Sequence, residues 1–275
     1  MSAQISAIYT YPLKSAKGIS HQECILEATG LLRDRRWMLG LDNGDVILEK
    51  LSQRECPKMA LIEVHALGNV LIVSAPDMPT LKVENVSTGR RNVQVWNDVC
   101  EGDDLGDEAA AWFSEFLELP LRLLRMPDTF YRRVDITYAP EAAQASYADG
   151  YPLLIISEAS LESLNQQMTE RGIGAVTMNR FRPNLVISGV DPFAEDTWKR
   201  FRIGEIEFDV VKPCARCVLT TVDPELGKIV NKAEPLATLA TFRRTPNGKV
   251  MFGQNVVHRG IGTLHVGDEL EILTT

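Results

Sequence analysis

Two cysteines and an arginine stand within four consecutive residues, Cys214-Ala215-Arg216-Cys217. A cysteine thiolate is a soft ligand that suits zinc, copper(I) or iron–sulfur clusters. The cationic side chains of Arg216 and Lys212 favour the thiolate form and hold anions nearby. We expect this stretch to form a short turn between two β-like runs, where it can bind a metal or perform thiol chemistry.

Three interpretations of the thiol pair are simpler than a catalytic centre. A structural zinc site needs four ligands, but the other three cysteines stand alone and no histidine has metal-ligand spacing from the pair. A thioredoxin-like dithiol opens a helix, whereas a β-branched run, 218–222, follows this pair. Free cysteines are also often buried and inert, although the intervening Arg216 disfavours an apolar burial site.

Short stretches rich in β-branched and aromatic residues recur along the chain and predict a mainly β protein. Asn43-Gly44 is typical of a tight hairpin turn, and Gly267-Asp268 predicts a last hairpin. The expected strands are 4–10, 24–28, 37–41, 46–48, 61–65, 70–74, 80–83, 92–96, 121–124, 153–156, 185–188, the hairpin 201–211, a strand led by 252–255, and 270–273.

Helices are expected in three places, and one long segment has no periodicity at all. Apolar residues recur every three or four positions in 106–118, and Ser157 can cap a helix over about 158–170. A third, short helix is expected at 234–243. The polar segment 128–149 has no such pattern, and loops of this length are often functional.

Composition limits the classes of protein and partner. The chain has 275 residues, of which 45% are hydrophobic and 24% charged, as in a soluble globular protein of one large or two ordinary domains. Its formal net charge of −8 disfavours a large surface for nucleic acid or anionic membrane. Five cysteines without framework spacing suit a reducing compartment, and no signal peptide or membrane-spanning run is present. We therefore expect a cytoplasmic protein that binds neither nucleic acid nor membrane.

Basic and polar side chains stand at the ends of predicted strands, far apart in the sequence. Lys14 and Ser15 follow the first strand, and three arginines surround an aspartate in Arg33-Asp34-Arg35-Arg36. Arg182 precedes Pro183, which favours an extended backbone at a strand entrance. Each group alone fits either a solvated loop or an anion-binding edge, so these residues by themselves leave their role open.

Five separated motifs together resemble the MOSC family. They are Tyr11-Pro12-Leu13-Lys14-Ser15, Arg33-Asp34-Arg35, Phe181-Arg182-Pro183-Asn184, Phe252-Gly253-Gln254, and the core motif Cys214-Ala215-Arg216-Cys217 with Thr220-Thr221-Val222-Asp223-Pro224. The chain looks most like the branch that includes the mitochondrial amidoxime reducing component and its bacterial relatives. That resemblance covers nearly the whole chain. It implies a mainly β fold with a few helices (α+β), with a β-barrel-like domain over 1–120 followed by a MOSC β-barrel domain over 121–275.

The resemblance also implies a cofactor, the molybdenum cofactor, which is a pterin with a dithiolene and a phosphate. By motif, Cys217 would be the molybdenum ligand and the catalytic residue, with Cys214 beside it but not bound to the metal. Arg216 and the backbone of Ala215 would contact the pterin. The expected holders of the phosphate and the polar pterin edge are Lys14, Ser15, Arg35 and Arg182. Residues at matching positions with less defined roles are Asp149, Gly150, Tyr151 and Asn255.

The implied activity is reduction of N-hydroxylated compounds, such as amidoximes, hydroxylamines or N-hydroxylated bases. Because the chain lacks a cysteine-rich cluster motif, we expect its electrons to come from a separate flavin or iron–sulfur reductase. The segment 128–147 is the expected mouth of the substrate site. Two other functions stay open: a sulfur carrier that passes a persulfide from Cys217 or Cys214, and a module that holds the cofactor without catalysis.

Overall fold

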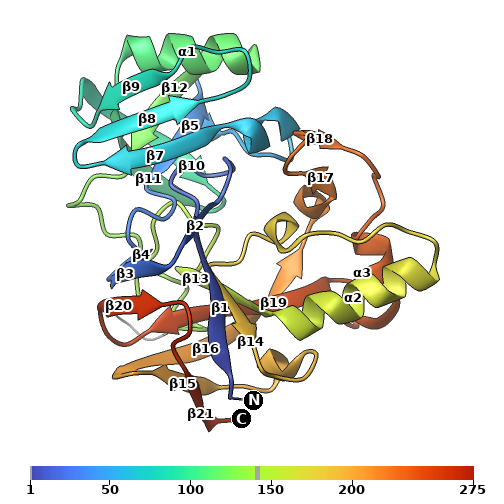
Figure 1. The fold of residues 1–275 in the computed structure, drawn as a ribbon. Coiled ribbons are helices and arrows are strands. Elements are labelled where there is room, and N and C mark those ends of the chain that lie inside the picture. The colour runs from blue at the N-terminus through green and yellow to red at the C-terminus, as the bar shows by residue number, and fades with distance from the viewer. Residues whose placement is uncertain (1, 140–142) are drawn as a thin grey trace.

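The computed structural model describes residues 2–139 and 143–275 and consists mainly of strands. Figure 1 shows two halves: a barrel with helix α1 (Asp107–Leu117) at its outer end, and a larger sheet with helices α2 (Glu158–Glu170) and α3 (Leu236–Phe242). The predicted mainly β fold with an N-terminal barrel is therefore confirmed. None of the helices in the described ranges is long and apolar enough to cross a membrane.

Five strands close into the barrel in the order β10-β11-β12-β5-β6. Strands β10 and β6 run parallel, with Gln94 opposite Glu49, so both strands end at the same rim of the barrel. A smaller sheet, β7-β8-β9, and α1 pack with the barrel in one hydrophobic core that contains Leu71 and Phe113. The strands are β5 Trp37–Leu41, β6 Ile47–Lys50, β7 Glu63–Leu67, β8 Val70–Ser74, β9 Leu81–Glu84, β10 Gly89–Val95, β11 Asp98–Asp104 and β12 Leu121–Arg125.

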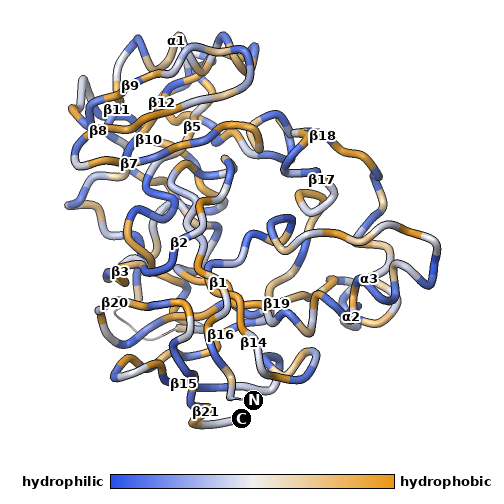
Figure 2. Tube along the Cα trace, in the orientation of Figure 1, coloured by the Kyte–Doolittle hydropathy of each residue, from blue (hydrophilic) through white to orange (hydrophobic). Residues whose placement is uncertain are grey.

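The second half is an eight-stranded sheet in the order β2-β1-β14-β13-β19-β16-β15-β21. It curls towards closure, because the Ile5 amide donates to Asp268 O (2.9 Å) and the Leu270 amide donates to Ala3 O (2.8 Å). Figure 2 shows hydrophobic segments along strands such as β14 and more hydrophilic stretches in many connecting loops. The strands are β1 Gln4–Thr10, β2 Ile19–His21, β13 Leu153–Ser157, β14 Leu185–Ser188, β15 Arg200–Ile203, β16 Ile206–Arg216, β19 Val250–His258 and β21 Leu270–Thr274.

Apart from helix α2 the remaining elements are short; α2 and β3 lie where the sequence predicted them, whereas β4, β18 and β20 were not expected. Helix α2 begins as predicted, with Ser157 Oγ accepting a hydrogen bond from the Ser160 amide (3.1 Å). The short strands are β3 Glu23–Glu27, β4 Gly30–Leu31, β17 Val222–Asp223, β18 Lys228–Ile229 and β20 Gly262–His265. The 3-10 turns are η1 Pro57–Leu61, η2 Met178–Arg180, η3 Ala194–Asp196 and η4 Val218–Thr221.

Two other differences from the sequence prediction concern the last hairpin and strand β11. Gly267-Asp268 does not close a hairpin, because β20 pairs with β3 whereas β21 pairs with β15. Strand β11 was not expected, since four acidic residues interrupt its apolar pattern. Its last residue, Asp104, is buried and paired with Arg122 at 2.7 Å, which makes a strand of that composition stable.

Strands cross the expected boundary between residues 120 and 121 in both directions. Strand β12 begins at Leu121 and yet completes the barrel, while β1, near the N-terminus, lies inside the large sheet between β2 and β14. The division at 120 thus separates two stretches of sequence but not the two sheets. Because the chain passes between the halves more than once, their junction is built from many distant segments.

Candidate functional site

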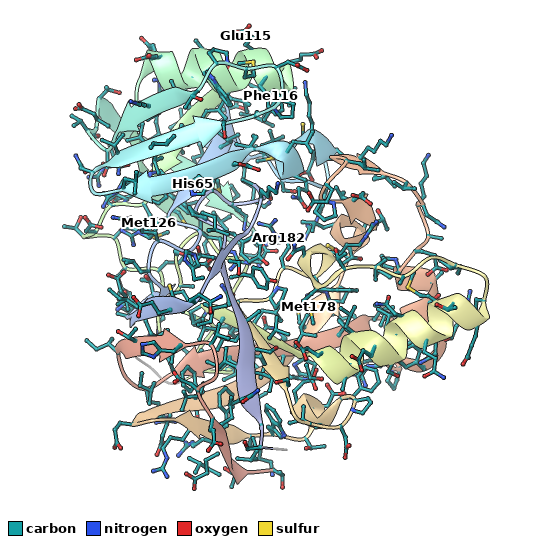
Figure 3. All side chains as sticks on the ribbon, in the orientation of Figure 1. His65, Glu115, Phe116, Met126, Met178 and Arg182 are labelled. Carbon is teal, nitrogen blue, oxygen red and sulfur yellow. The ribbon has the colours of Figure 1, made fainter. Side chains whose placement is uncertain are left out.

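One cavity lies where the barrel meets the large sheet, and its wall contains every site residue expected from the sequence. These residues are Lys14, Ser15, Arg35, Asp149, Gly150, Tyr151, Arg182, Ala215, Arg216, Cys217 and Asn255. Cys214 lies in the same wall. Figure 3 shows Arg182 at the junction of the two halves. The fold therefore brings together segments that the sequence keeps far apart.

The thiol pair does not lie in a turn between two strands, as the sequence suggested. Strand β16 continues through Arg216, with two β-bulges between Val210 and Ala215 where it pairs with β19. Cys217 then precedes the single 3-10 turn η4, so the expected β-like run after the pair is also wrong for its first four residues. Bulges redirect side chains and are common beside active sites, which explains how this strand end reaches the cavity.

The two cysteines have different surroundings. Cys214 Sγ lies 3.0 Å from Arg216 Nη1 and packs against the apolar cluster that includes Phe181 and Phe252. Cys217 is also only partly buried, but within the described ranges no group forms a hydrogen bond to its Sγ. Neither thiol is sealed in an apolar interior. Cys217 is therefore the thiol available to a ligand, while Cys214 helps to orient Arg216.

Lys14 and Asp149 form an ion pair in the cavity wall, and burial affects the pKa of each partner differently. The Lys14 ammonium donates to Tyr147 O (2.7 Å) and Asp149 Oδ1 (2.5 Å), and Lys14 is only 5% exposed. Burial lowers the pKa of Lys14 by more than Asp149 raises it. Burial would raise the pKa of Asp149, but the charge and hydrogen bond of Lys14, together with smaller effects of Trp96 and Arg54, outweigh it and hold that pKa below its usual range. Lys14 is thus a cation that would gain from a further anion in the cavity.

Arg35 and Arg182 both stack on the buried ring of Tyr11. Their guanidinium carbons lie 4.3 and 4.1 Å from the ring centroid. The Tyr11 hydroxyl donates to Pro183 O (3.0 Å), which fixes the ring. Burial lowers the pKa of Arg182 to about 10, and the charge of Arg35 acts in the same direction. Two cations held on one ring repel each other, so an anion bound here would relieve a cost already present.

Four residues of the cavity wall have a left-handed backbone that non-glycine residues rarely adopt. Their φ angles are 68° for Ser15, 49° for Arg35, 57° for Trp96 and 56° for Arg182. The extended backbone expected for Arg182 because Pro183 follows it is therefore wrong. Such residues cost of order 1–3 kcal/mol each and cluster at ligand-binding sites, where the surrounding structure enforces them.

Three buried guanidinium nitrogens on wall residues have no hydrogen-bond partner: Arg54 Nε, Arg182 Nη2 and Arg216 Nε. An unsatisfied buried donor costs free energy, and folded proteins contain few of them. A phosphate supplies several acceptor oxygens and negative charge, which is what such donors require. The donor set therefore fits the phosphate and polar edge of the expected cofactor.

Buried Arg132 positions the segment that delivers Asp149 to the wall. Its guanidinium donates to the main-chain oxygens of Ser146 (2.8 Å) and Ala148, and it pairs with Asp98 at 2.9 Å. Because these contacts restrain the backbone directly before Asp149, Arg132 acts on the site through that segment and not by lining the cavity.

Asn255 and Tyr151 complete the predicted set. Asn255 Nδ2 donates to Lys212 O (3.1 Å), which ties β19 to β16 just before the thiol pair. Burial raises the pKa of Tyr151 to about 12, so its phenol stays protonated at neutral pH.

The segment 128–147 does not reach the cavity wall in its described residues, and 140–142 lie outside the described ranges. Arg132 and Tyr147 are instead buried, and the Tyr147 hydroxyl donates to Glu101 O (2.7 Å) on the barrel. The expected mouth of the site is thus not formed by this part of the chain. The barrel supplies that side of the wall.

Four wall residues from the barrel were not anticipated: Lys50, Ser52, Arg54 and Trp96. Lys50 ends β6 and Trp96 follows β10, and the parallel pairing of these strands brings them to one rim. No motif marks any of them. The one available signal was Trp96 itself, because a large aromatic residue at the end of a predicted strand, directly before the turn-forming residue Asn97, is unusual.

The two halves of the chain each match a known domain. The MOSC N-terminal beta barrel domain matches residues 2–120, and the MOSC domain matches residues 142–271. Human mitochondrial amidoxime reducing component 2 is 34% identical over 282 residues, covering 96% of this chain and 82% of that protein. Human mitochondrial amidoxime-reducing component 1 is 35% identical over 290 residues, covering 98% and 82%.

Two further comparisons match less well, one in the length covered and the other in structure. Molybdenum cofactor sulfurase of Solanum lycopersicum is 32% identical over 266 residues, covering 90% of this chain but 32% of that protein. The crystal structure of the YUAD protein from Bacillus subtilis covers 98% of this chain and 94% of its own at 12% identity, with a TM-score of 0.37, and adds no argument. On the domain matches and the amidoxime reducing components, the chain belongs to the MOSC family, in the branch where a MOSC N-terminal β-barrel domain precedes the MOSC domain.

Proposed function

We propose that this protein is a molybdenum cofactor-dependent reductase of N-hydroxylated compounds such as amidoximes, hydroxylamines or N-hydroxylated bases. One observation carries the proposal: an available thiol, Cys217, shares a cavity with six cationic side chains and three unpartnered guanidinium donors. The similarity to two amidoxime reducing components supports the class of reaction.

In this proposal the anionic cofactor binds across the cavity. Lys14, Ser15, Arg35 and Arg182 hold its phosphate, and Arg216 contacts the pterin. The Cys217 thiolate is the protein ligand of molybdenum, since a soft sulfur suits that metal site. Within the described ranges no three His, Cys, Asp or Glu side chains could hold a metal ion together, so the cofactor dithiolene would have to supply further ligands. Once bound, the cofactor supplies the two-electron chemistry that removes oxygen from nitrogen.

The protein side chains then hold the reactants and the protons. Asp149 stays ionised at neutral pH because Lys14 holds its pKa low, which makes it a poor proton donor. The Tyr151 hydroxyl in the same wall is protonated at neutral pH, because burial raises its pKa to about 12, whereas burial lowers the pKa of Lys14. The cations around them stabilise negative charge that develops on a bound N-hydroxyl oxygen.

Two matched cysteine variants test the proposal. Protein made in a host that synthesises the cofactor should contain molybdenum and reduce benzamidoxime with an artificial electron donor. Cys217→Ser should lose both the metal and the turnover, whereas Cys214→Ser should keep the metal. Wild-type protein without molybdenum, or equal metal in both variants, would overturn the proposal. A persulfide on Cys217 in metal-free protein would favour the sulfur carrier, and metal without turnover would favour the non-catalytic module.

The electron donor is proposed to be a separate flavin or iron–sulfur reductase. Purified protein that reduces benzamidoxime with NADH or NADPH alone would contradict this. The cytoplasmic location expected from cysteine usage stays a prediction.

A further inference from the structure

We propose that Lys50, Arg54 and Trp96, here called the cationic rim, bind an anionic group of the substrate. Building on the proposed function, this makes the preferred substrates N-hydroxylated compounds that carry a carboxylate or a phosphate. All three residues belong to the barrel half and line the same cavity as Cys217.

The backbone at Trp96 has a conformation that favours glycine. It begins the two-residue turn between β10 and β11 with a φ of 57°, where glycine is favoured. It also remains 44% exposed, so burial does not repay the strain. A large aromatic ring kept in a strained, exposed turn at a cavity points to a role in binding.

The ring of Trp96 holds two cations at the rim. Lys50 Nζ lies 4.8 Å and Arg54 Cζ 4.5 Å from the ring centroid. Strand pairing accounts for this arrangement, because β6 and β10 run parallel and end side by side. The contact between Lys50 and Trp96 therefore follows from the barrel itself, and Arg54 reaches the ring from the turn that follows β6.

These two cations lack adequate negative charge around them. Within residues 2–139 and 143–275, no carboxylate lies within 4.0 Å of Lys50 Nζ. Arg54 has Asp149 at 3.9 Å, but that carboxylate is already paired with Lys14 at 2.5 Å. Arg54 Nε is moreover buried without an acceptor. An anion reaching the rim would satisfy a donor and compensate two charges.

The rim lies nearer to solvent than the residues assigned to the cofactor phosphate. Lys14 and Ser15 are each 5% exposed, and the Arg35 side chain is 13% exposed. The Arg54 side chain is 24% exposed and Trp96 44% exposed. A molecule that enters after the cofactor is bound therefore meets the rim first, which assigns the rim to the substrate.

Matched substrate pairs test the assignment and identify the anion. Benzamidoxime is compared with 4-carboxybenzamidoxime, and N4-hydroxycytidine with its 5′-monophosphate. Lys50→Gln should lower the preference for the charged member, as the ratio of kcat/KM values, roughly fivefold in at least one pair. The pair that responds shows whether carboxylate or phosphate is recognised. Lys82→Gln, an exposed lysine on β9 outside the cavity wall, should leave both ratios unchanged.

Trp96→Gly tests the ring without disturbing the fold, because glycine readily adopts the left-handed backbone of this turn. It should keep the protein folded and lower the same ratio. Unchanged ratios in both Lys50→Gln and Trp96→Gly would overturn the proposal, and so would loss of molybdenum from Lys50→Gln, which would assign the rim to the cofactor.

Equilibrium dialysis of benzamidoxime and 4-carboxybenzamidoxime against molybdenum-loaded protein separates this inference from the proposed function. If the wild type turns over neither compound, the proposed function fails. The rim proposal still stands if the charged compound binds more tightly and Lys50→Gln abolishes that difference, and it fails if the two compounds bind alike.

Discussion

Replacing Asp34 by asparagine should destabilise the protein by about 2–3 kcal/mol. Asp34 is 2% exposed, and its carboxylate accepts hydrogen bonds from the Tyr11 amide (2.7 Å) and from Arg35 Nη1 (2.5 Å). Asparagine has nearly the same shape and can still accept from one donor. The variant therefore removes the charge that balances Arg35 while it disturbs the packing little.

The expected size follows from the contacts that remain. Two unit charges 4 Å apart at an effective dielectric constant near 20 attract by about 4 kcal/mol. The neutral amide costs less to bury than a carboxylate, which offsets part of that loss. Arg35 also keeps Asn184 Oδ1 at 3.0 Å and Arg182 O at 3.3 Å as acceptors. For a chain of this size, 2–3 kcal/mol corresponds to a decrease in Tm of about 5–10 °C.

Urea unfolding of cofactor-free protein measures the effect, with Asp45→Asn, an exposed aspartate, as control. A double-mutant cycle with Arg35→Gln isolates the coupling between the two side chains. If Asp34→Asn stays within about 1 kcal/mol of the wild type, as Asp45→Asn should, the reasoning is refuted. Arg35 would then be held by its other acceptors alone.

Two further predictions follow from backbone geometry and from charge. Gly253→Ala should destabilise by about 3 kcal/mol in urea unfolding, because φ is 78° and the new Cβ would lie 2.6 Å from Ile156 Cγ1. Gly174→Ala, with open space around it, should change stability by less than about 0.5 kcal/mol. The folded-state pKa of Asp149 is held low by Lys14, so its contribution is present above about pH 4 and lost on acidification. The stability difference between wild type and Asp149→Asn should therefore stay constant from about pH 7 to pH 5 and shrink as the pH falls below about 4, and a difference that stays constant on acidification would contradict the assignment.

Local patterns in the sequence carried enough information for most of the fold. Alternation predicted β1 at its observed bounds, and the capping residue Ser157 predicted the start of α2. Strand β11 could not be found in this way, since Asp104 is stabilised by Arg122, a contact between residues eighteen positions apart. The pairing of β20 and β21 with separate partners likewise depends on tertiary contacts that no turn motif specifies.

The residues of the candidate site also fall into those that the sequence predicted and those that only tertiary contacts bring together. Every site residue predicted from the family motifs lies in the wall, because resemblance places a residue without knowledge of its neighbours. Three other wall residues, Phe181, Asn184 and Thr220, belong to the same motifs but were not predicted as site residues. Lys50, Arg54 and Trp96 carry no motif, and the parallel pairing of β6 with β10 brings Trp96 beside Lys50 and the turn that carries Arg54. Parallel pairing joins strands that are distant in sequence, so residue spacing along the chain could not indicate that cluster.

The backbone at Arg182 and Trp96 shows why such residues escape prediction yet mark the site. Local preference would make Arg182 extended before proline and would put glycine at Trp96, but both have left-handed φ angles. A residue held in a backbone conformation that its type disfavours costs stability. Such residues persist mainly where they contribute to function. Here both contradictions lie in one cavity, beside buried donors that lack acceptors. Strain and unmet hydrogen bonds are independent costs, and a bound anion can offset them together. Their coincidence is therefore stronger evidence for an anionic ligand than either feature alone.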